Sequence, residues 1–232
     1  MKNNKVIGWL FIAGAVGVLV PYTLLTINFD YPQILREDSG LILTRFHAAG
    51  TSLILTWWAF ALLGLPLLIA YILIGQKLEN KTGFVKTATV LGIISGVVQI
   101  IGLLRWVFVV PVLADKFVNA TDEATKTAVT TDFQIIHQLF GVLLGEHLGQ
   151  LFTILWTLMM SYTFIKLKIF PGWFSGLGIF ASFIYLLAQA ELIATVIPGF
   201  PVWSMAGFIG STLWLIWLIL LGMFFIQKKT EI

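Results

Sequence analysis

Residues 48–74 read AAGTSLILTWWAFALLGLPLLIAYILI, a stretch that contains no charged side chain. A helix needs about 20 apolar residues to cross the roughly 30 Å hydrocarbon core of a bilayer. Five further apolar runs long enough for this occupy residues 7–27, 86–113, 133–165, 171–196 and 203–226. The sequence therefore predicts an all-α membrane protein, a bundle of six transmembrane helices that forms a single transmembrane domain over residues 1–232.

The composition indicates that the chain is embedded in lipid and that the bilayer is its main binding partner. Hydrophobic residues make up 59% of the chain and charged residues only 11%, against about a quarter charged in a typical globular domain. Nine Trp and nineteen Phe residues are typical of lipid interfaces and wide apolar surfaces. The net charge of +3 does not indicate nucleic-acid binding, because no basic run exceeds two residues. With no cysteine, the chain has neither disulfides nor thiolate ligands.

The lysines and arginines predict the orientation, since cytoplasmic loops are enriched in them. With the N-terminus inside, the inner segments hold nine, namely Lys2, Lys5, Lys77, Lys81, Lys86, Lys166, Lys168, Lys228 and Lys229. The outer loops hold four, namely Arg36, Arg45, Lys116 and Lys126. This bias places both termini in the cytoplasm.

Two outer segments have features of ordered structure. In the Asn28–Gly40 loop, Pro32 restricts the backbone of Tyr31, and we expect this loop to be ordered over the outer face. In the second outer loop, Thr121 followed by Asp122 and Glu123 resembles a helix start. The fourth helix should therefore project outside before it enters the bilayer.

Ionisable residues inside the spans are the main indication of a functional site. A charged group in the bilayer costs at least ~2.5–3.5 kcal/mol on insertion scales. Five residues fall inside spans, with His47 at a boundary; they are Arg105, His137, Glu146, His147 and Glu191. At about 1.5 Å of rise per residue, all of them lie between the outer surface and just past the middle of the membrane. We expect a pocket that opens outward or a buried network beneath the outer loops.

An unpaired arginine at this depth would be very costly, so we predict that Arg105 forms an ion pair. Glu191 lies at a similar depth and is the first choice of partner, with Glu146 second. A buried pair that only fixes helix packing is an equally weighted interpretation, because such pairs are weak indicators of function.

The fourth span carries two stripes at helical spacing. Along one, His137 is followed by Gly141, Gly145 and Gly149, and small residues of this kind favour close helix packing. The other is polar and descends toward the inner surface through Glu146, Gln150, Thr153, Thr157 and Ser161. It could conduct protons or line a water path, or it could form interhelical hydrogen bonds. Gln99 of the third span comes near the depth of Glu146, so spans three to five should meet.

The histidines raise cofactor hypotheses. Haem b would need two facing imidazoles, for which His47 and His137 are closest in depth. Zinc would need three or four ligands from His47, His137, His147, Glu146 and Asp30. No local signature supports either cofactor, since His137 and His147 are ten residues apart. No hydrolase, metalloprotease or phosphate-loop motif is present either, so the sequence leaves enzymatic activity undecided.

Four strings carry a family resemblance: FDYPQILR at 29–36, RFHAAGT at 45–51, LLRWVF at 103–108 and GEHLG at 145–149. They resemble the landmarks of the bacterial domain-of-unknown-function family 4386. The resemblance implies a multi-pass protein of the bacterial inner membrane and implies no activity. The strings include Asp30 and Arg45, together with four of the residues that the depth argument selected.

The leading hypothesis is a buried polar site, open to the outside, that binds a small ligand or ion and is coupled to protons. Its predicted residues are Arg105, Glu146, His147, His137, Glu191, Gln99, Gln150, Arg45 and Asp30. One alternative is a haem- or zinc-binding intramembrane enzyme or redox protein that uses His47, His137 and His147. Another is a structural or regulatory membrane subunit. Self-association as a homo-oligomer stays open.

Overall fold

The computed structural model describes residues 2–227, and within that range the ordered elements are all helical. Six segments are long and apolar enough to cross a membrane, which confirms the predicted fold class. They consist of α1 (Lys2–Phe29); α2 (Ser39–Leu63) with α3 (Leu65–Leu78); α4 (Phe84–Phe108) with α5 (Val110–Val118); α6 (Glu123–Ile136), η2 (His137–Leu148) and α7 (Gly149–Leu167); α8 (Gly172–Leu187) with α9 (Gln189–Ala194); and α10 (Ala206–Gln227). A short 3₁₀ helix, η1 (Gln33–Arg36), lies between the first two spans.

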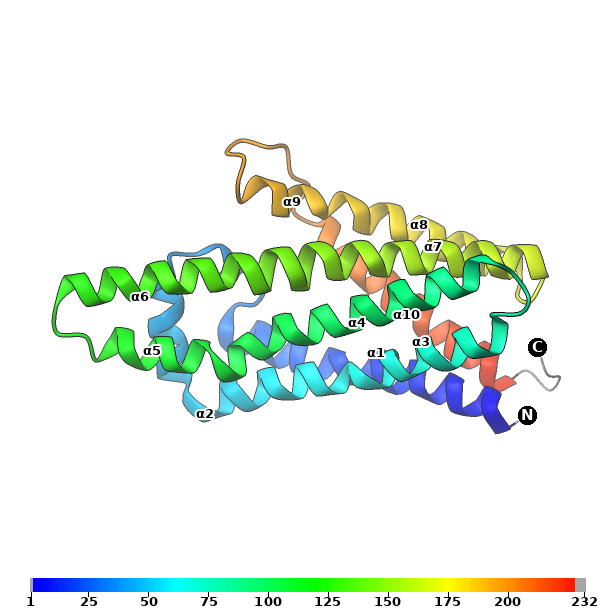
Figure 1. The fold of residues 1–232 in the computed structure, drawn as a ribbon, viewed down its shortest axis with the longest axis horizontal. Helices are drawn as coiled ribbons and strands as arrows, with labels where there is room; N and C mark the ends of the chain where they lie inside the picture. Colours follow the sequence, from blue (N-terminus) through cyan, green and yellow to red (C-terminus); the bar gives the residue numbers. More distant parts are fainter. Residues whose placement is uncertain (1, 228–232) are drawn as a thin grey trace.

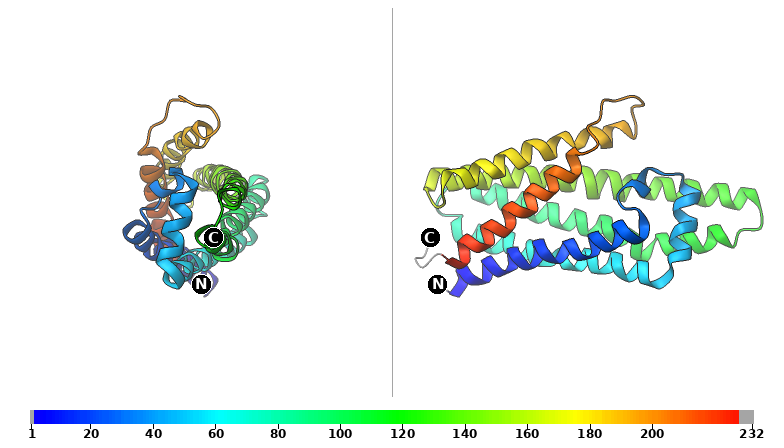
Figure 2. Two further views of the ribbon diagram at one scale, coloured as in Figure 1. Left: turned by 90° about the vertical axis from the view of Figure 1, so that its left-hand side faces the viewer. Right: turned by 180° about the vertical axis from the view of Figure 1, so that it is seen from behind.

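The spans are arranged as a closed ring in chain order. Each span packs against the next, α8 packs against both α7 and α10, and α10 returns to pack along α1. The view in the left panel of Figure 2 runs along the bundle and shows the helices around a common centre. Side chains that point to this centre therefore meet partners from spans that are distant in the sequence.

The first and last described residues lie at the same end of the bundle (Figure 1), as an even number of crossings requires. The α3–α4 and α7–α8 connections lie at that end too, with the predicted inner lysines of both loops. We call it the inner end. Lys228 and Lys229 lie outside the described residues, and the orientation of the bundle in the membrane stays a prediction.

The opposite, outer end reaches well beyond the predicted span limits. The fourth span runs from Glu123 to Leu167, 45 residues, which at 1.5 Å per residue is about 68 Å and twice the hydrocarbon thickness. The hairpin of α5 and α6 accordingly projects past the other helices (Figure 1). Asp122 begins α6, where its side chain accepts a hydrogen bond from the amide of Thr125, so the predicted helix start is confirmed.

A sharp break at Gly50 shapes the second span. Gly50 has φ 63° and ψ −152° inside α2, a backbone conformation that glycine adopts without steric cost. The preceding half of α2 turns across the bundle (Figure 2, right panel). The break positions the start of α2 and the connection before it over the outer side of the ring.

Two aromatic cores fill the ring at different levels. In the inner core, Tyr71 lies 4.3 Å from Trp156, which lies 5.8 Å from Trp217, between ring centroids. These residues come from α3, α7 and α10 and occupy the centre. In the outer core, Trp57 and Trp106 stack at 4.9 Å with planes 10° apart. The ionisable residues described next lie toward the outer end.

Candidate functional site

Arg36 is the residue that links the acidic side chains of the outer half. Its Nη2 lies 2.8 Å from Oε2 of Glu146, and its Nε lies 3.3 Å from Oε1 of Glu191. The three residues belong to η1, η2 and α9. The arginine thus joins the outer connection to two different spans, at a place where 29% of its side chain is exposed.

The electrostatics of Arg36 and the adjacent Tyr31 follow from this arrangement. Burial acts to lower the pKa of Arg36, but the charge and hydrogen bond of Glu146, with the charge of Glu191, more than offset burial and hold the pKa above its ordinary value. Burial, reinforced by the charge of Glu146, raises the pKa of the Tyr31 hydroxyl. Arg36 is therefore firmly cationic, and Tyr31 stays neutral.

Glu146 lies on a π-helix. The segment η2 runs for 12 residues, His137 to Leu148, with the wider turn of i→i+5 hydrogen bonding that is rare and frequent at functional sites. His137 begins this segment, and His147 is its last residue but one. Three predicted site residues therefore share one unusual element.

The predicted small-residue stripe of this span packs against α4. A Cβ on Gly141 would lie 2.6 Å from Nη2 of Arg105, and a Cβ on Gly149 would lie 2.5 Å from Cγ of Gln99. The backbones of Gly145 and Gly102 are in direct contact, since a Cβ on Gly102 would lie 2.8 Å from the Cα of Gly145. The packing interpretation of the stripe therefore holds, and it leaves room for two long polar side chains of α4.

The surroundings of Arg105 differ from the prediction. The predicted ion pair with Glu191 is not formed within residues 2–227, and neither is one with Glu146. Instead, Nη1 of Arg105 donates to the carbonyl of Gly102, and its Cζ lies 5.0 Å above the Trp106 ring. Only 6% of the residue is exposed, and its Nε has no hydrogen-bond partner. The physical reason is that Arg36, from outside the spans, already binds both carboxylates.

A cavity of about 500 Å³ opens at the outer side of this cluster. Its wall comes from η1, α2, α6, η2 and α9 and consists of Leu35, Arg36, Glu37, Ser39, Ile42, Phe133, Gln134, His137, Gln138, Val142, Glu191, Ala194 and Thr195. We call it the outer cavity. Glu146 is not part of its wall but is bound to Arg36, which is.

His137 is the most unusual group of the outer cavity. The residue is only 8% exposed, its ring approaches the backbone of Leu35, and neither ring nitrogen makes a well-aligned hydrogen bond. Its ring stacks on Phe133 at 5.4 Å and meets Trp106 edge-on at 6.1 Å. Buried polar atoms nearly always have partners, so this imidazole is a group for which a bound molecule would supply the missing hydrogen bond.

Deeper in the bundle, His147 and Gln150 belong to one hydrogen-bonded chain. Nδ1 of His147 lies 2.7 Å from Oε1 of Gln189, whose Nε2 donates to Oε1 of Gln150 at 2.7 Å. This chain ties the fourth span to α9. His147 and Gln150 therefore share Gln189 as their hydrogen-bond partner. Neither residue is part of the wall of the outer cavity.

The lower polar stripe is also occupied by interhelical contacts. Nε2 of Gln99 donates to Ser95 and to Thr153, while Thr157 accepts from Nε1 of Trp214 at 3.1 Å. Thr153 and Thr157 also donate to carbonyls of their own helix. These bonds support the interpretation of the stripe as helix packing.

Two tyrosines lie near Glu146, and a third contacts one of them. Tyr31 and Tyr185 both interact electrostatically with Glu146, and Tyr31 meets Tyr22 edge-on at 5.5 Å. They come from the α1–α2 connection, α8 and α1. None of the three hydroxyl groups has a hydrogen-bond partner among the residues that the structure describes.

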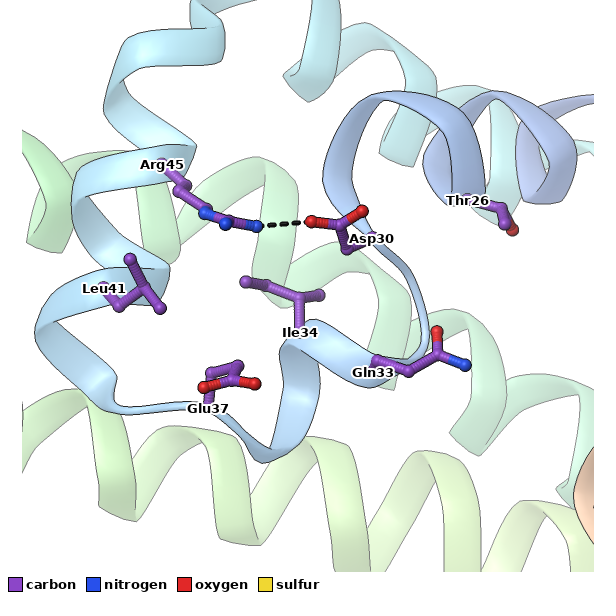
Figure 3. Close-up of a pocket in the computed structure, with 7 residues that line it drawn as sticks. All are labelled: Thr26, Asp30, Gln33, Ile34, Glu37, Leu41 and Arg45. Atoms are coloured by element: carbon purple, nitrogen blue, oxygen red, sulfur yellow. Dashed lines mark hydrogen bonds and ion pairs between the residues drawn. The ribbon is translucent and has the colours of Figure 1, made fainter. Parts of the chain in front are cut away.

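Asp30 and Arg45 lie at a second hollow. Figure 3 shows their side chains pointing toward each other, joined by an ion pair, in a cavity of about 490 Å³. Its wall consists of Thr26, Asp30, Gln33, Ile34, Glu37, Leu41 and Arg45. Only Glu37 belongs to both cavities, so this pair belongs to the outer surface and not to the Arg36 cluster.

The histidines do not converge on a shared ligand. Nε2 of His47 lies 3.7 Å from Oδ1 of Asp115, whereas His137 lies among aromatic rings and His147 binds Gln189. Within residues 2–227, no group of three or more His, Asp or Glu side chains is placed to share a metal ion. The haem and zinc hypotheses gain no support.

Arg36 is the central site residue that the sequence did not predict, and Tyr31, Glu37 and Gln138 were not predicted either. Arg36 lies in the outer connection, where charged residues are ordinary, and no periodicity relates it to Glu146 at a separation of 110 residues. The one available signal was the family string at 29–36, which contains it. His137, Glu146, His147 and Glu191 were predicted because they are ionisable within apolar runs.

Comparison with known protein families identifies the family of this chain. The comparisons with curated proteins and with solved structures gave no match. The family model described as "Domain of unknown function (DUF4386)" matches residues 6–222, a range that includes all six spans except the ends of the first and last. The family resemblance of the four strings is confirmed, and the chain belongs to the DUF4386 family.

Proposed function

We propose that this protein binds a small polar ligand in the outer cavity, which is accessible from the outer side of the bacterial inner membrane. The observation that carries the proposal is His137, an imidazole that is 8% exposed, forms part of the cavity wall and has at most the backbone of Leu35 as a polar contact for its two nitrogens. A volume of about 500 Å³ lies within the range of about 300–1,000 Å³ typical of small-molecule sites.

The surrounding polar groups support binding over a purely structural role. Arg36, Glu191 and Gln138 reach the same cavity from three elements, and convergent polar groups in a hollow are the usual basis of ligand orientation. Proton coupling through Glu146 is the less supported part, because the hydrogen bonds below it serve helix packing.

The test is thermal unfolding of the purified full chain with four chemically distinct probes: ethylammonium chloride, sodium acetate, glycine and glucose. A ligand that binds the folded state raises the unfolding midpoint. Ala194→Trp fills the cavity wall, and Val196→Trp, at a side chain 66% exposed and outside that wall, is the matched control.

At least one probe class is expected to raise the midpoint of the wild type and of Val196→Trp but not of Ala194→Trp. The proposal fails if no class raises the midpoint, or if Ala194→Trp responds as strongly as the wild type.

A further inference from the structure

The charges around the outer cavity are mainly negative. Its wall contains the carboxylates of Glu37 and Glu191 and one cation, Arg36. Arg36 is in turn bound to a third carboxylate, that of Glu146. The guanidinium group is thus the single positive charge among the side chains of this wall, and without it the carboxylates of Glu146 and Glu191 would lose their shared cation.

Arg36 reaches these carboxylates from outside the bundle. It is the last residue of η1, a helix of four residues within the connection between α1 and α2. Glu146 and Glu191, by contrast, lie on the fourth and fifth spans. The cation therefore belongs to the outer connection, while its binding site belongs to the ring of helices.

The remaining polar atoms of the site are mostly acceptors or can act as acceptors. Gln138 donates its Nε2 to Thr195 at 3.1 Å, which leaves its carbonyl oxygen to accept. The ring of His137 can accept at one nitrogen. The hydroxyl groups of Tyr31 and Tyr185 interact electrostatically with Glu146 and can also act as acceptors.

We propose that the ligand of the outer cavity is a small organic cation that carries N–H donors, a primary ammonium or a guanidinium group, and that it replaces the Arg36 guanidinium between Glu146 and Glu191. This inference rests on the proposed binding function and specifies its ligand. A cation that displaces Arg36 keeps the charge of the site unchanged, whereas an anion would add to an excess of carboxylates. Arg36 then acts as a built-in competitor that occupies the site in the absence of ligand.

The experiment measures binding of ethylammonium and guanidinium, as chloride salts at matched ionic strength, to the full chain in nanodiscs by calorimetry. Arg36→Gln removes the competing cation and keeps an uncharged polar side chain. Because the apparent affinity rises with the fraction of open site, this variant should bind both cations about tenfold more tightly or better than the wild type. Adding Glu191→Gln to it should abolish that gain.

A second variant keeps the test decisive if Arg36→Gln does not fold. Glu191→Gln in the wild-type background retains the pair of Arg36 with Glu146 and should weaken cation binding about tenfold, since it removes one of the two charged acceptors. Glu123→Gln, at an exposed carboxylate on α6, is the control and should bind like the wild type.

The inference is overturned if Arg36→Gln binds cations no more tightly than the wild type, or if Arg36→Gln with Glu191→Gln binds them equally well. If acetate, glycine or glucose binds in a manner blocked by Ala194→Trp while neither cation binds, the proposed function stands and the cation assignment falls. If no probe binds at all, both fall.

Discussion

Arg36 and Glu146 are separated by 110 residues in the chain, and the Nη2 of one lies 2.8 Å from the Oε2 of the other. This contact connects the outer loop to the π-helix of the fourth span. Arg105, the arginine of the third span, interacts with Glu146 electrostatically, but the carboxylate forms its ion pair with Arg36.

Double-mutant cycles should rank the two ion pairs of Arg36. Glu146 lies nearer to Arg36 than Glu191 does and has a side chain that is 19% rather than 40% exposed. The cycle of Arg36→Gln with Glu146→Gln should therefore give a coupling of about 1–3 kcal/mol, typical of a charged hydrogen bond. The cycle with Glu191→Gln should give less than about 1 kcal/mol. The free energy of unfolding, from denaturant titration, is the measured quantity.

The exposed pair of Lys126 and Glu123 provides the control cycle, with a coupling near zero. A stronger coupling to Glu191 than to Glu146 would contradict the geometry.

Gly102→Ala should destabilise the protein through a backbone clash. The new methyl group would lie 2.8 Å from both Cα of Gly145 and the carbonyl oxygen of Phe140, and backbone atoms cannot move aside as a flexible side chain can. We expect a loss of about 1–3 kcal/mol in the free energy of unfolding, typical of overpacking. Gly176→Ala, where nothing lies within 4 Å of the new methyl group, should be neutral or stabilising by up to about 1 kcal/mol. Equal effects at the two positions would disprove this account of the α4 contact.

Asp122 should make the start of α6 sensitive to pH. Hydrogen bonds from the backbone amide and then the hydroxyl of Thr125 hold the pKa of the Asp122 carboxyl below its ordinary value. Because the folded-state pKa is depressed, the cap contributes its full stability above the unfolded value of about 3.9 and loses it as pH falls through the lower folded value. Amide-exchange protection at residues 124–126 should drop across that acidic range.

Asp122→Asn retains a capping oxygen without a titrating charge. In this variant, the amide-exchange protection of residues 124–126 should therefore not depend on the protonation of a cap. A pH-dependent loss of equal size in Asp122→Asn would show that another group is responsible.

Cysteine labelling can test the orientation directly, since the native chain has no cysteine. Thr121→Cys places a thiol at the tip of the α5–α6 hairpin, and Asn80→Cys places one between α3 and α4. With the termini in the cytoplasm, a membrane-impermeant maleimide should label Thr121→Cys in intact cells and Asn80→Cys only after permeabilisation. The reverse pattern would invert the outer and inner assignments.

The six spans could be predicted from the sequence because the hydrophobicity that drives membrane insertion is a local property of each run. The outer ends of the spans were predicted less accurately. The fourth span begins at Glu123 instead of about 133, since its polar first turns lie beyond the apolar run and are held by packing against α5 and α2. The candidate site was also partly predictable, because ionisable residues such as His137 and Glu146 stand out within an apolar background.

The class of protein, the number of spans and the unusual membrane-embedded residues all follow from the amino-acid sequence. The partners of those residues depend on how the helices pack. Arg105 binds a carbonyl and an aromatic ring instead of Glu191, and Glu191 binds Arg36. The physical reason is that charge pairing depends on distances across the closed ring of helices, where residues more than a hundred positions apart meet, and no local pattern of apolar and polar residues specifies those distances.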